Sequence, residues 1–376
     1  MPDHDVVIVG GGPVGMLLAC LLTVRGRDVI VCERRSDADT RSRAIGIHRP
    51  GLDALDDAGI GDRVRAEALA LEGGEVRSRR RVIASLRFDS ERPVLTLAQS
   101  RTDALLRERL AELADGALRT GHAVQGVHDE GDRVRVRVEG DDGDQRDLTA
   151  SVVVAADGVR SGIRADQGIE WRRRSGTAVY AMVDVDDPDP RARAVLHCEP
   201  AGLVESLPLP GGRRRWVLRQ DATNRAQPLT AAEFRAEIEH RTGLSPVIGD
   251  EDRPVSFVAA QHSARTVARG RIALLGDAAH EISPIGGQGM NLGWTDARVL
   301  TEVLCRSPLD RMPDLGRYER ATHRSARRAQ RRSAFYMSMG EPASAVPLAA
   351  REMLIRGMGS PMLRRRTTGL LTMRGV

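Results

Sequence analysis

The sequence predicts an α/β protein, in which a parallel sheet is combined with a mostly antiparallel sheet and with C-terminal helices. Three observations predict this class. Residues 6–9 and 152–154 are unbroken β-branched runs, which are typical of strands buried on both faces of a parallel sheet. Residues 169–258 are typical of short strands joined by Pro, Gly and Asp turns. From residue 315 onward the pattern favours helices. A chain of 376 residues with 41% apolar content is long enough for two or three domains.

The first predicted strand ends in the glycine-rich turn GGGPVG. Gly10 allows a tight turn, Gly12 lets the backbone approach a pyrophosphate, and Gly15 lets a helix pack closely on the strand. Pro13 suits the first turn of that helix. Glu33 follows a second buried strand about 20 residues later, where a ribose needs an acceptor. The pattern predicts a Rossmann-like dinucleotide site and leaves the choice between FAD and NAD open.

Composition excludes several other classes of protein. The chain has 57 basic residues, and all of them are Arg. They are scattered along the chain, so the net charge of +5 does not indicate a nucleic-acid surface. The four cysteines have no CxxC or metal-ligand spacing, and we expect them to be reduced and no metal to be bound. The longest apolar run, residues 16–24, is about half of what a membrane span needs. Acidic residues precede the first strand, unlike a signal peptide. We therefore expect a soluble, cytoplasmic protein.

Capping and turn signals predict the remaining helices. Pro50 is expected to begin a helix that ends at Gly59, and Ser100 or Thr102 is expected to cap another. A third helix is expected at residues 231–241, with Thr230 as its cap. A fourth helix is expected to follow from the glycine-rich segment at residues 276–297 and to reach about Cys305. Breaks in the C-terminal helices are expected near Gly340, Pro342, Gly359 and Pro361.

Two further glycine-bearing segments also follow predicted strands. They are AADGVRSGIR at residues 155–164 and LLGDAAHEISPIGGQGMNLGWTDA at residues 274–297. Because parallel strands end at one edge of a sheet, both segments are expected beside the first turn. The three together resemble the class A flavoprotein monooxygenases, the family of para-hydroxybenzoate hydroxylase, polyketide hydroxylases and tetracycline-inactivating monooxygenases.

This resemblance implies the domain organisation and the cofactor. It implies a Rossmann-like FAD-binding domain with a mostly antiparallel substrate sheet and C-terminal helices. The FAD-binding domain is expected at residues 1–70, 98–168 and 262–310. The substrate-binding sheet domain is expected at 71–97 and 169–261, and the helical segment at 311–376.

The resemblance also implies residue roles around the flavin. Asp277 would accept a hydrogen bond from a ribityl hydroxyl, and the helix start near Gly289 would face the negative charge of reduced flavin. Arg43 and Pro284 are the expected catalytic residues, with gating and flavin-face roles. The expected cofactor-binding residues are Gly10, Gly12, Pro13, Gly15, Glu33, Arg34, Arg43, Gln99, Asp157, Gly276, Asp277, Pro284, Gly287, Gly289, Met290 and Asn291. Family members often have two prolines where this chain has Ser283-Pro284.

Several aromatic and histidine side chains have two interpretations. Tyr180, His197 and Trp216 lie on strands of the second sheet, so they could line a substrate pocket or simply pack within the sheet. His280 could be a base, although a structural histidine is the more usual case. His48 could reach flavin or substrate, or it could be an exposed residue leading into a helix.

The implied function is that of an FAD-dependent monooxygenase. NADPH or NADH would reduce the flavin, O2 would form a C4a-hydroperoxide, and one oxygen atom would pass to an aromatic or polyketide-like small molecule, most simply by hydroxylation. Neither a nucleic-acid partner nor a membrane is expected, and the protein would be a monomer or homodimer. The alternatives are a flavin oxidase or reductase of the same fold, or a non-catalytic carrier. A flavin halogenase is disfavoured because the chain has no WxWxIP string.

Overall fold

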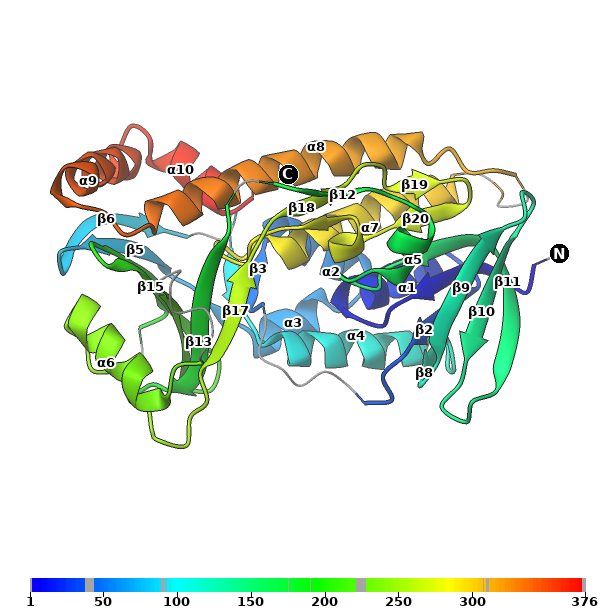
Figure 1. The fold of residues 1–376 in the computed structure, drawn as a ribbon, viewed down its shortest axis with the longest axis horizontal. Coiled ribbons are helices and arrows are strands. Elements are labelled where there is room, and N and C mark those ends of the chain that lie inside the picture. Colours follow the sequence, from blue (N-terminus) through cyan, green and yellow to red (C-terminus); the bar gives the residue numbers. More distant parts are fainter. Residues whose placement is uncertain are drawn as a thin grey trace.

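The computed structural model describes residues 2–37, 44–88, 91, 93–174, 176–189, 191–220, 228–306, 308 and 311–373. Two large sheets lie side by side along the long axis of the molecule, as Figure 1 shows. The fold is a mixed α/β architecture, and the predicted class is confirmed.

The first large sheet has a parallel centre built from the most apolar strands. In spatial order these strands are β20 (Ile272–Leu274), β11 (Gln145–Ala155), β1 (His4–Val9), β2 (Val29–Glu33) and β8 (Leu118–Thr120). Antiparallel strands extend it, namely β9 (Ala123–Asp129), β10 (Val134–Glu139) and β19 (Ala268–Arg269). Val7 and Val153 are fully buried, as expected for strands covered on both faces.

Helices cover this sheet and form one apolar core with it. They are α1 (Pro13–Val24), α2 (Arg49–Asp57), α3 (Gly61–Glu67), α4 (Gln99–Leu113), α5 (Gly162–Asp166) and α7 (Gly289–Cys305). The eight residues from Gly15 to Leu22 are all buried because α1 packs against both α4 and α7. The expected caps of α4 were wrong. This helix begins at Gln99 after Ala98, and Thr102 is a buried residue inside it.

The second large sheet is antiparallel except for one pair of strands. Its order is β17 (Val255–Ala259), β13 (Ala178–Asp186), β16 (Arg213–Arg219), β15 (Gly202–Leu209), β14 (Arg193–Glu199), β5 (Gly73–Ser78) and β6 (Arg81–Arg87). Gly211 and Gly212, both with positive φ, form the hairpin turn between β15 and β16. One face of the sheet packs on α6 (Ala231–Thr242), which Thr230 caps through a capping box with Glu233.

Two small sheets join the larger ones. One is formed by β3 (Gly46–His48), β7 (Val94–Thr96) and β4 (Leu69–Ala70), and the other by β12 (Trp171–Arg173), β18 (His262–Ala264) and β21 (His280–Glu281). Figure 1 shows β3, β12 and β18 between the two large sheets. They therefore fix the loops at the junction.

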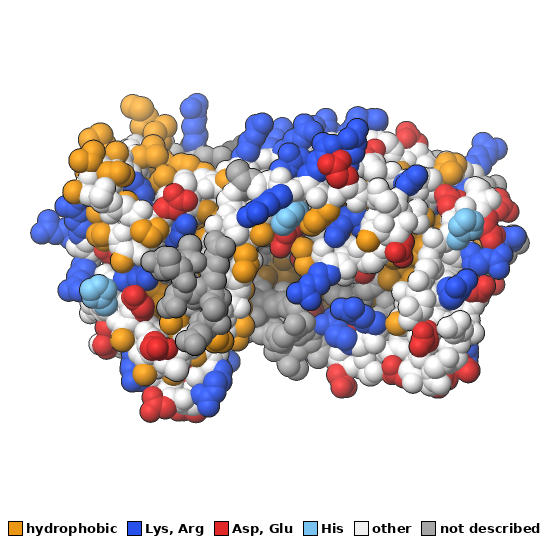
Figure 2. All heavy atoms as spheres, viewed as in Figure 1, with side chains coloured by type: hydrophobic (Ala, Val, Ile, Leu, Met, Phe, Trp, Pro, Cys, Tyr) orange, Lys and Arg blue, Asp and Glu red, His pale blue; other side chains and the backbone are white. Residues whose placement is uncertain are grey.

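The C-terminal helices are α8 (Gly316–Met339), α9 (Ala345–Gly359) and α10 (Arg364–Leu371). They end close to the predicted breaks. Helix α8 runs along both large sheets (Figure 1), because Tyr318 packs in the first core and Met337 in the core of the second sheet. Its arginines form a basic row on the surface, as Figure 2 shows. Within the described part of the chain, every helix is too short or too polar to cross a membrane.

Candidate cofactor and substrate site

The glycine turn after β1 is tightly packed on one side and open on the other. Gly10 has a φ of 110°, and a Cβ added there would lie 2.4 Å from the Ala156 carbonyl oxygen. A Cβ on Gly15 would lie 2.2 Å from the Gly10 carbonyl oxygen. At Gly12, by contrast, no described atom lies within 4 Å of such a Cβ. Gly10 and Gly15 are therefore needed for the fold, whereas Gly12 leaves space beside the start of α1.

Glu33 closes the turn from the end of β2. It is 4% exposed, and its Oε2 accepts a hydrogen bond from the Gly11 N–H at 2.7 Å. Its Oε1 accepts from the backbone and side chain of Arg35 at 3.0 Å each. Burial raises the pKa of Glu33, but these hydrogen bonds outweigh burial and lower it overall. The ionised carboxylate keeps spare lone pairs for a ribose hydroxyl, while neighbouring Arg34 is exposed to solvent.

Arg107, which the sequence did not single out, also reaches the glycine turn. It projects from α4, and its Nη2 donates to the Gly11 carbonyl oxygen at 3.1 Å. Its Nε is buried and has no hydrogen-bond partner in the described residues. A guanidinium with a spare donor beside an open glycine turn suits a pyrophosphate. Gln99, the first residue of the same helix, is half-buried.

The second segment follows β11 and lies against the first turn. Gly158 has a φ of 82°, and Asp157 Oδ2 accepts a long hydrogen bond from the Ile163 N–H at 3.4 Å. Asp157 Oδ1 is buried, and no described group bonds to it. The side chain of Arg160 is exposed. Asp157 therefore has an acceptor to offer a ligand.

The third segment touches the first at Val14. A Cβ added at Gly276 or at Gly293 would lie 3.2 or 2.7 Å from a Val14 methyl group, respectively. Trp294 Nε1 donates to the Pro13 carbonyl oxygen at 3.1 Å. Asp277, in the single-turn 3-10 helix after β20, is exposed. The three glycine-bearing segments therefore converge at one edge of the sheet.

The loop before α7 is fixed by Asn291. Its Oδ1 accepts from the His48 N–H at 2.9 Å, and its Nδ2 donates to the carbonyl oxygens of Gly46 and Gly287 at 2.9 and 3.0 Å. Asn291 thus uses its side chain to hold two loops together. The backbone N–H groups at the start of α7, beside the buried Met290, are the groups left to face a ligand.

Two buried side chains at this loop have unused polar atoms. Gln288 is fully buried, and neither its Oε1 nor its Nε2 has a partner among the described residues. His48 is 7% exposed, so of its two interpretations the exposed residue leading into a helix is excluded. Burial lowers the pKa of His48 to about 4, which keeps the ring neutral. Such orphaned groups are costly unless a ligand satisfies them. Gln288 was not among the residues predicted from the sequence, but it lies within the motif GGQGMN, which could have indicated it.

Other predicted residues of the loop lie apart from this buried centre. Pro284 is exposed, and its carbonyl oxygen accepts from the Gly287 N–H at 2.9 Å. Ser283, in place of the family's first proline, is fully buried. Arg43 lies outside the described residues.

His280 is buried against helix α7. Its Nε2 forms a short contact with Asp296 Oδ2, and Asp296 Oδ1 accepts from the Thr322 hydroxyl at 3.3 Å. Burial lowers the pKa of His280, but the Asp296 carboxylate outweighs burial and raises it overall. This contact ties β21, α7 and α8 together, which favours the structural interpretation.

The second sheet divides the three candidate pocket residues between its two faces. Tyr180 is buried with Ile285 and Met337, on the face that meets the loop before α7 and helix α8. Trp216 packs with Phe234 of α6 on the opposite face. His197 pairs with Val204, another residue of the α6 face. The structure therefore brings only Tyr180 of the three to the side of the cofactor loop.

The turns and the sheet together define a dinucleotide-binding α/β protein with a second sheet facing its ligand edge. The space at Gly12 and the orphaned atoms of Gln288, Asp157 and Arg107 fit an FAD molecule spread along this edge. A family model described as FAD binding domain matches residues 3–333, so the chain belongs to this family.

Named relatives and solved structures agree with this family. The 12-dehydrotetracycline 5-monooxygenase/anhydrotetracycline 6-monooxygenase of Streptomyces rimosus is 32% identical over 308 residues, covering 78% of this chain and 61% of that protein. A 3-(3-hydroxy-phenyl)propionate/3-hydroxycinnamic acid hydroxylase of Burkholderia cenocepacia is 32% identical, covering 78% of this chain and 55% of that protein. The chain thus spans less than two thirds of the length of these relatives.

The fold is similar to p-nitrophenol 4-monooxygenase from Pseudomonas putida, with a TM-score of 0.85, 25% identity and 99% of each chain covered. It is also similar to an anhydrotetracycline hydroxylase from Streptomyces rimosus, with a TM-score of 0.79, 28% identity, and 99% and 76% of the two chains covered. The predicted resemblance to aromatic and polyketide hydroxylases is confirmed.

Proposed function

We propose that this protein is an FAD-dependent monooxygenase that uses NADPH or NADH and O2 to hydroxylate a small aromatic or polyketide-like molecule. One observation carries the proposal. Three glycine-bearing turns meet at one sheet edge, and the buried amide of Gln288, which has no partner among the described residues, lies between that edge and the second sheet. By their names, the first relative is a monooxygenase of 12-dehydrotetracycline and anhydrotetracycline, and the second is a hydroxylase of 3-(3-hydroxy-phenyl)propionate and 3-hydroxycinnamic acid.

The chain's own residues would bind and orient the cofactor. Glu33 would accept from the adenosine ribose, Arg107 and the start of α1 would face the pyrophosphate, and Asp277 would accept from the ribityl chain. When bound, FAD supplies the electron transfer and oxygen transfer that protein side chains lack. Gln288 and the N–H groups of α7 would then stabilise negative charge at the ring edge.

The second sheet would exclude water from the reacting centre. Its face around Tyr180 is mainly apolar and packs against Ile285, next to Pro284 of the cofactor loop. A dry, apolar face suits an aromatic ring and protects a reactive intermediate from water. We also propose the domain division given above, and a gating role for Arg43.

The test is substrate-dependent oxygenation by the purified protein loaded with FAD. NADPH and NADH oxidation is followed with a panel of phenols and polyketides, and products formed under labelled O2 are weighed. Gain of one labelled oxygen atom supports the proposal. A protein that binds FAD and oxidises NAD(P)H while forming only hydrogen peroxide with every compound would be an oxidase. A protein that does not bind FAD would fit the carrier alternative.

A further inference from the structure

Glu205 is a carboxylate in the middle of an otherwise apolar strand, GLVESLPL. On β15 it pairs with Leu196 of β14 and with Val217 of β16. Residues that pair directly across antiparallel strands point to the same face. Both partners belong to the cluster around Tyr180 and Ile285, so Glu205 lies on the face that meets the cofactor loop.

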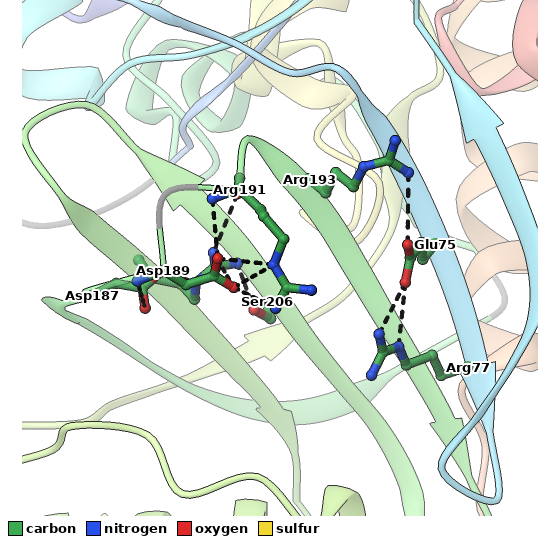
Figure 3. Close-up of polar contacts among 8 residues, drawn as sticks. Glu75, Arg77, Asp187, Asp189, Arg191, Arg193 and Ser206 are labelled. Atoms are coloured by element: carbon green, nitrogen blue, oxygen red, sulfur yellow. Dashed lines mark hydrogen bonds and ion pairs between the residues drawn. The ribbon is translucent and has the colours of Figure 1, made fainter.

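Glu205 is buried and has no partner among the residues that the structure describes. It is 6% exposed, and no hydrogen bond or ion pair joins it to any residue in the described part of the chain. Its neighbour Ser206, which points to the other face, accepts from Arg214 at 2.9 Å (Figure 3). In the same view Glu75 bonds to Arg77 at 3.1 Å. Glu75 is thus compensated within the protein, whereas Glu205 has no such partner among the described residues.

An unpaired buried carboxylate is unfavourable when ionised, and burial raises the pKa of Glu205 to about 7. Burial raises the pKa of Tyr180, and the Glu205 carboxylate raises it further. The guanidinium carbon of Arg219 lies 6.0 Å from the Tyr180 ring centre. The titratable groups influenced by the Glu205 carboxylate are Tyr180 and Cys198, and it raises the pKa of both side chains.

We propose that Glu205 recognises the hydroxyl group of a phenolic substrate and accepts its proton, a role that rests on the function proposed above. The O–H bond of the phenol breaks, its proton passes to a carboxylate oxygen of Glu205, and the electron pair stays on the substrate oxygen. Glu205 becomes neutral, which suits its buried position. The resulting phenolate is more electron-rich at its ring carbons and so reacts more readily with an electrophilic oxygen.

The test compares Glu205→Gln with the wild type and with Glu199→Gln. Gln has the same shape but does not take up the proton. Glu199 is an equally buried carboxylate at the end of β14, but its oxygens accept from the backbone N–H groups of Arg79 and Arg80, at 2.8 and 3.2 Å. It is therefore the matched control. Binding of 1-naphthol and of 1-methoxynaphthalene to each FAD-loaded protein is measured by equilibrium dialysis at pH 8.

We expect the wild type and Glu199→Gln to prefer naphthol over its methyl ether by about tenfold or more, because a buried acceptor needs a donor. Glu205→Gln should lose most of that preference. Equal affinities of the wild type for the two compounds, or an unchanged preference in Glu205→Gln, would overturn the role of Glu205. Failure of the proposed function would appear separately, as absence of oxygenated product from the wild type.

Stability against pH provides a second measurement that does not need a substrate. Folding raises the pKa of Glu205 from its ordinary value of 4.5 to about 7. Burial of Glu205 therefore destabilises the protein progressively as the pH rises from 4.5 to about 7. Glu205→Gln should remove that part of the pH dependence and should not unfold the protein. A variant less stable than the wild type at pH 8 would show that Glu205 has a structural partner, contrary to the proposal.

Discussion

The N–H of Gly11 donates to Glu33 Oε2 at 2.7 Å, so the glycine turn after β1 and the acid that ends β2 are held as one unit. This contact fixes a carboxylate beside the open space at Gly12 without using all of its acceptor capacity. The ribose and the pyrophosphate of a dinucleotide would therefore be bound by one rigid element.

Glu33→Ala should weaken FAD binding. Hydrogen bonds to a charged group contribute about 1.5–3 kcal/mol, so the dissociation constant should rise about 10- to 100-fold. Fluorescence titration with FAD measures it. Glu130→Ala, which removes a carboxylate paired with Arg133 on an exposed hairpin of the same sheet, is the control. Unchanged FAD affinity in Glu33→Ala would remove this residue from the site.

Gly12→Ala should affect FAD binding, whereas Gly10→Ala should affect stability. Gly12 has an ordinary φ of −79° and open space, so Gly12→Ala should fold normally but bind FAD poorly. Gly10→Ala should lower the melting temperature, because its Cβ would overlap the Ala156 carbonyl group. Thermal unfolding and FAD titration of both variants separate the two roles. Full FAD affinity in Gly12→Ala would mean that the open space is not the pyrophosphate position.

Gln288→Leu should leave the FAD-free protein as stable as the wild type, or more stable. The amide has no described partner, and a buried unpaired polar group costs about 1–3 kcal/mol. The same variant should bind FAD more weakly, because the amide would lose its ligand. Denaturant unfolding with and without FAD measures both effects. Loss of stability in the FAD-free variant would indicate that Gln288 is satisfied by the protein itself.

The buried His48 side chain should make the protein less stable at acidic pH. Burial lowers the pKa of His48 from 6.5 to about 4. The contribution of the neutral ring to folding stability is therefore fully present above pH 6.5 and is lost as the pH falls towards 4. The shift corresponds to a loss of up to about 3 kcal/mol. His48→Gln should reduce the slope of unfolding free energy between pH 6.5 and 4. Equal slopes in the wild type and His48→Gln would contradict this assignment.

The parts of the fold that depend on local signals were predictable from the sequence. Gly10 is required by a positive φ, and Thr230 with Glu233 forms a complete capping box within four residues. Both effects act over short stretches of chain. The start of α4 was missed because Thr102, a good capping residue, is instead buried inside the helix by tertiary packing.

The parts of the site that depend on distant contacts were not predictable in the same way. Arg107 is one arginine among several in a helix, and only packing of α4 on α1 brings it to Gly11. Trp216 and Tyr180 lie on neighbouring strands, but the register places them on opposite faces of the sheet. Glu205 did carry a signal in the sequence, because it is the only acid in an otherwise apolar strand. The structure shows that this acid is buried.

The most direct measurement is a titration of the purified, FAD-free protein with FAD, followed by visible absorbance and calorimetry. If the three turns form one site, the protein should bind one FAD per chain and become yellow. A chain that remains colourless at saturating FAD, or one whose binding is equal in the wild type and Gly12→Ala, would contradict the central claim.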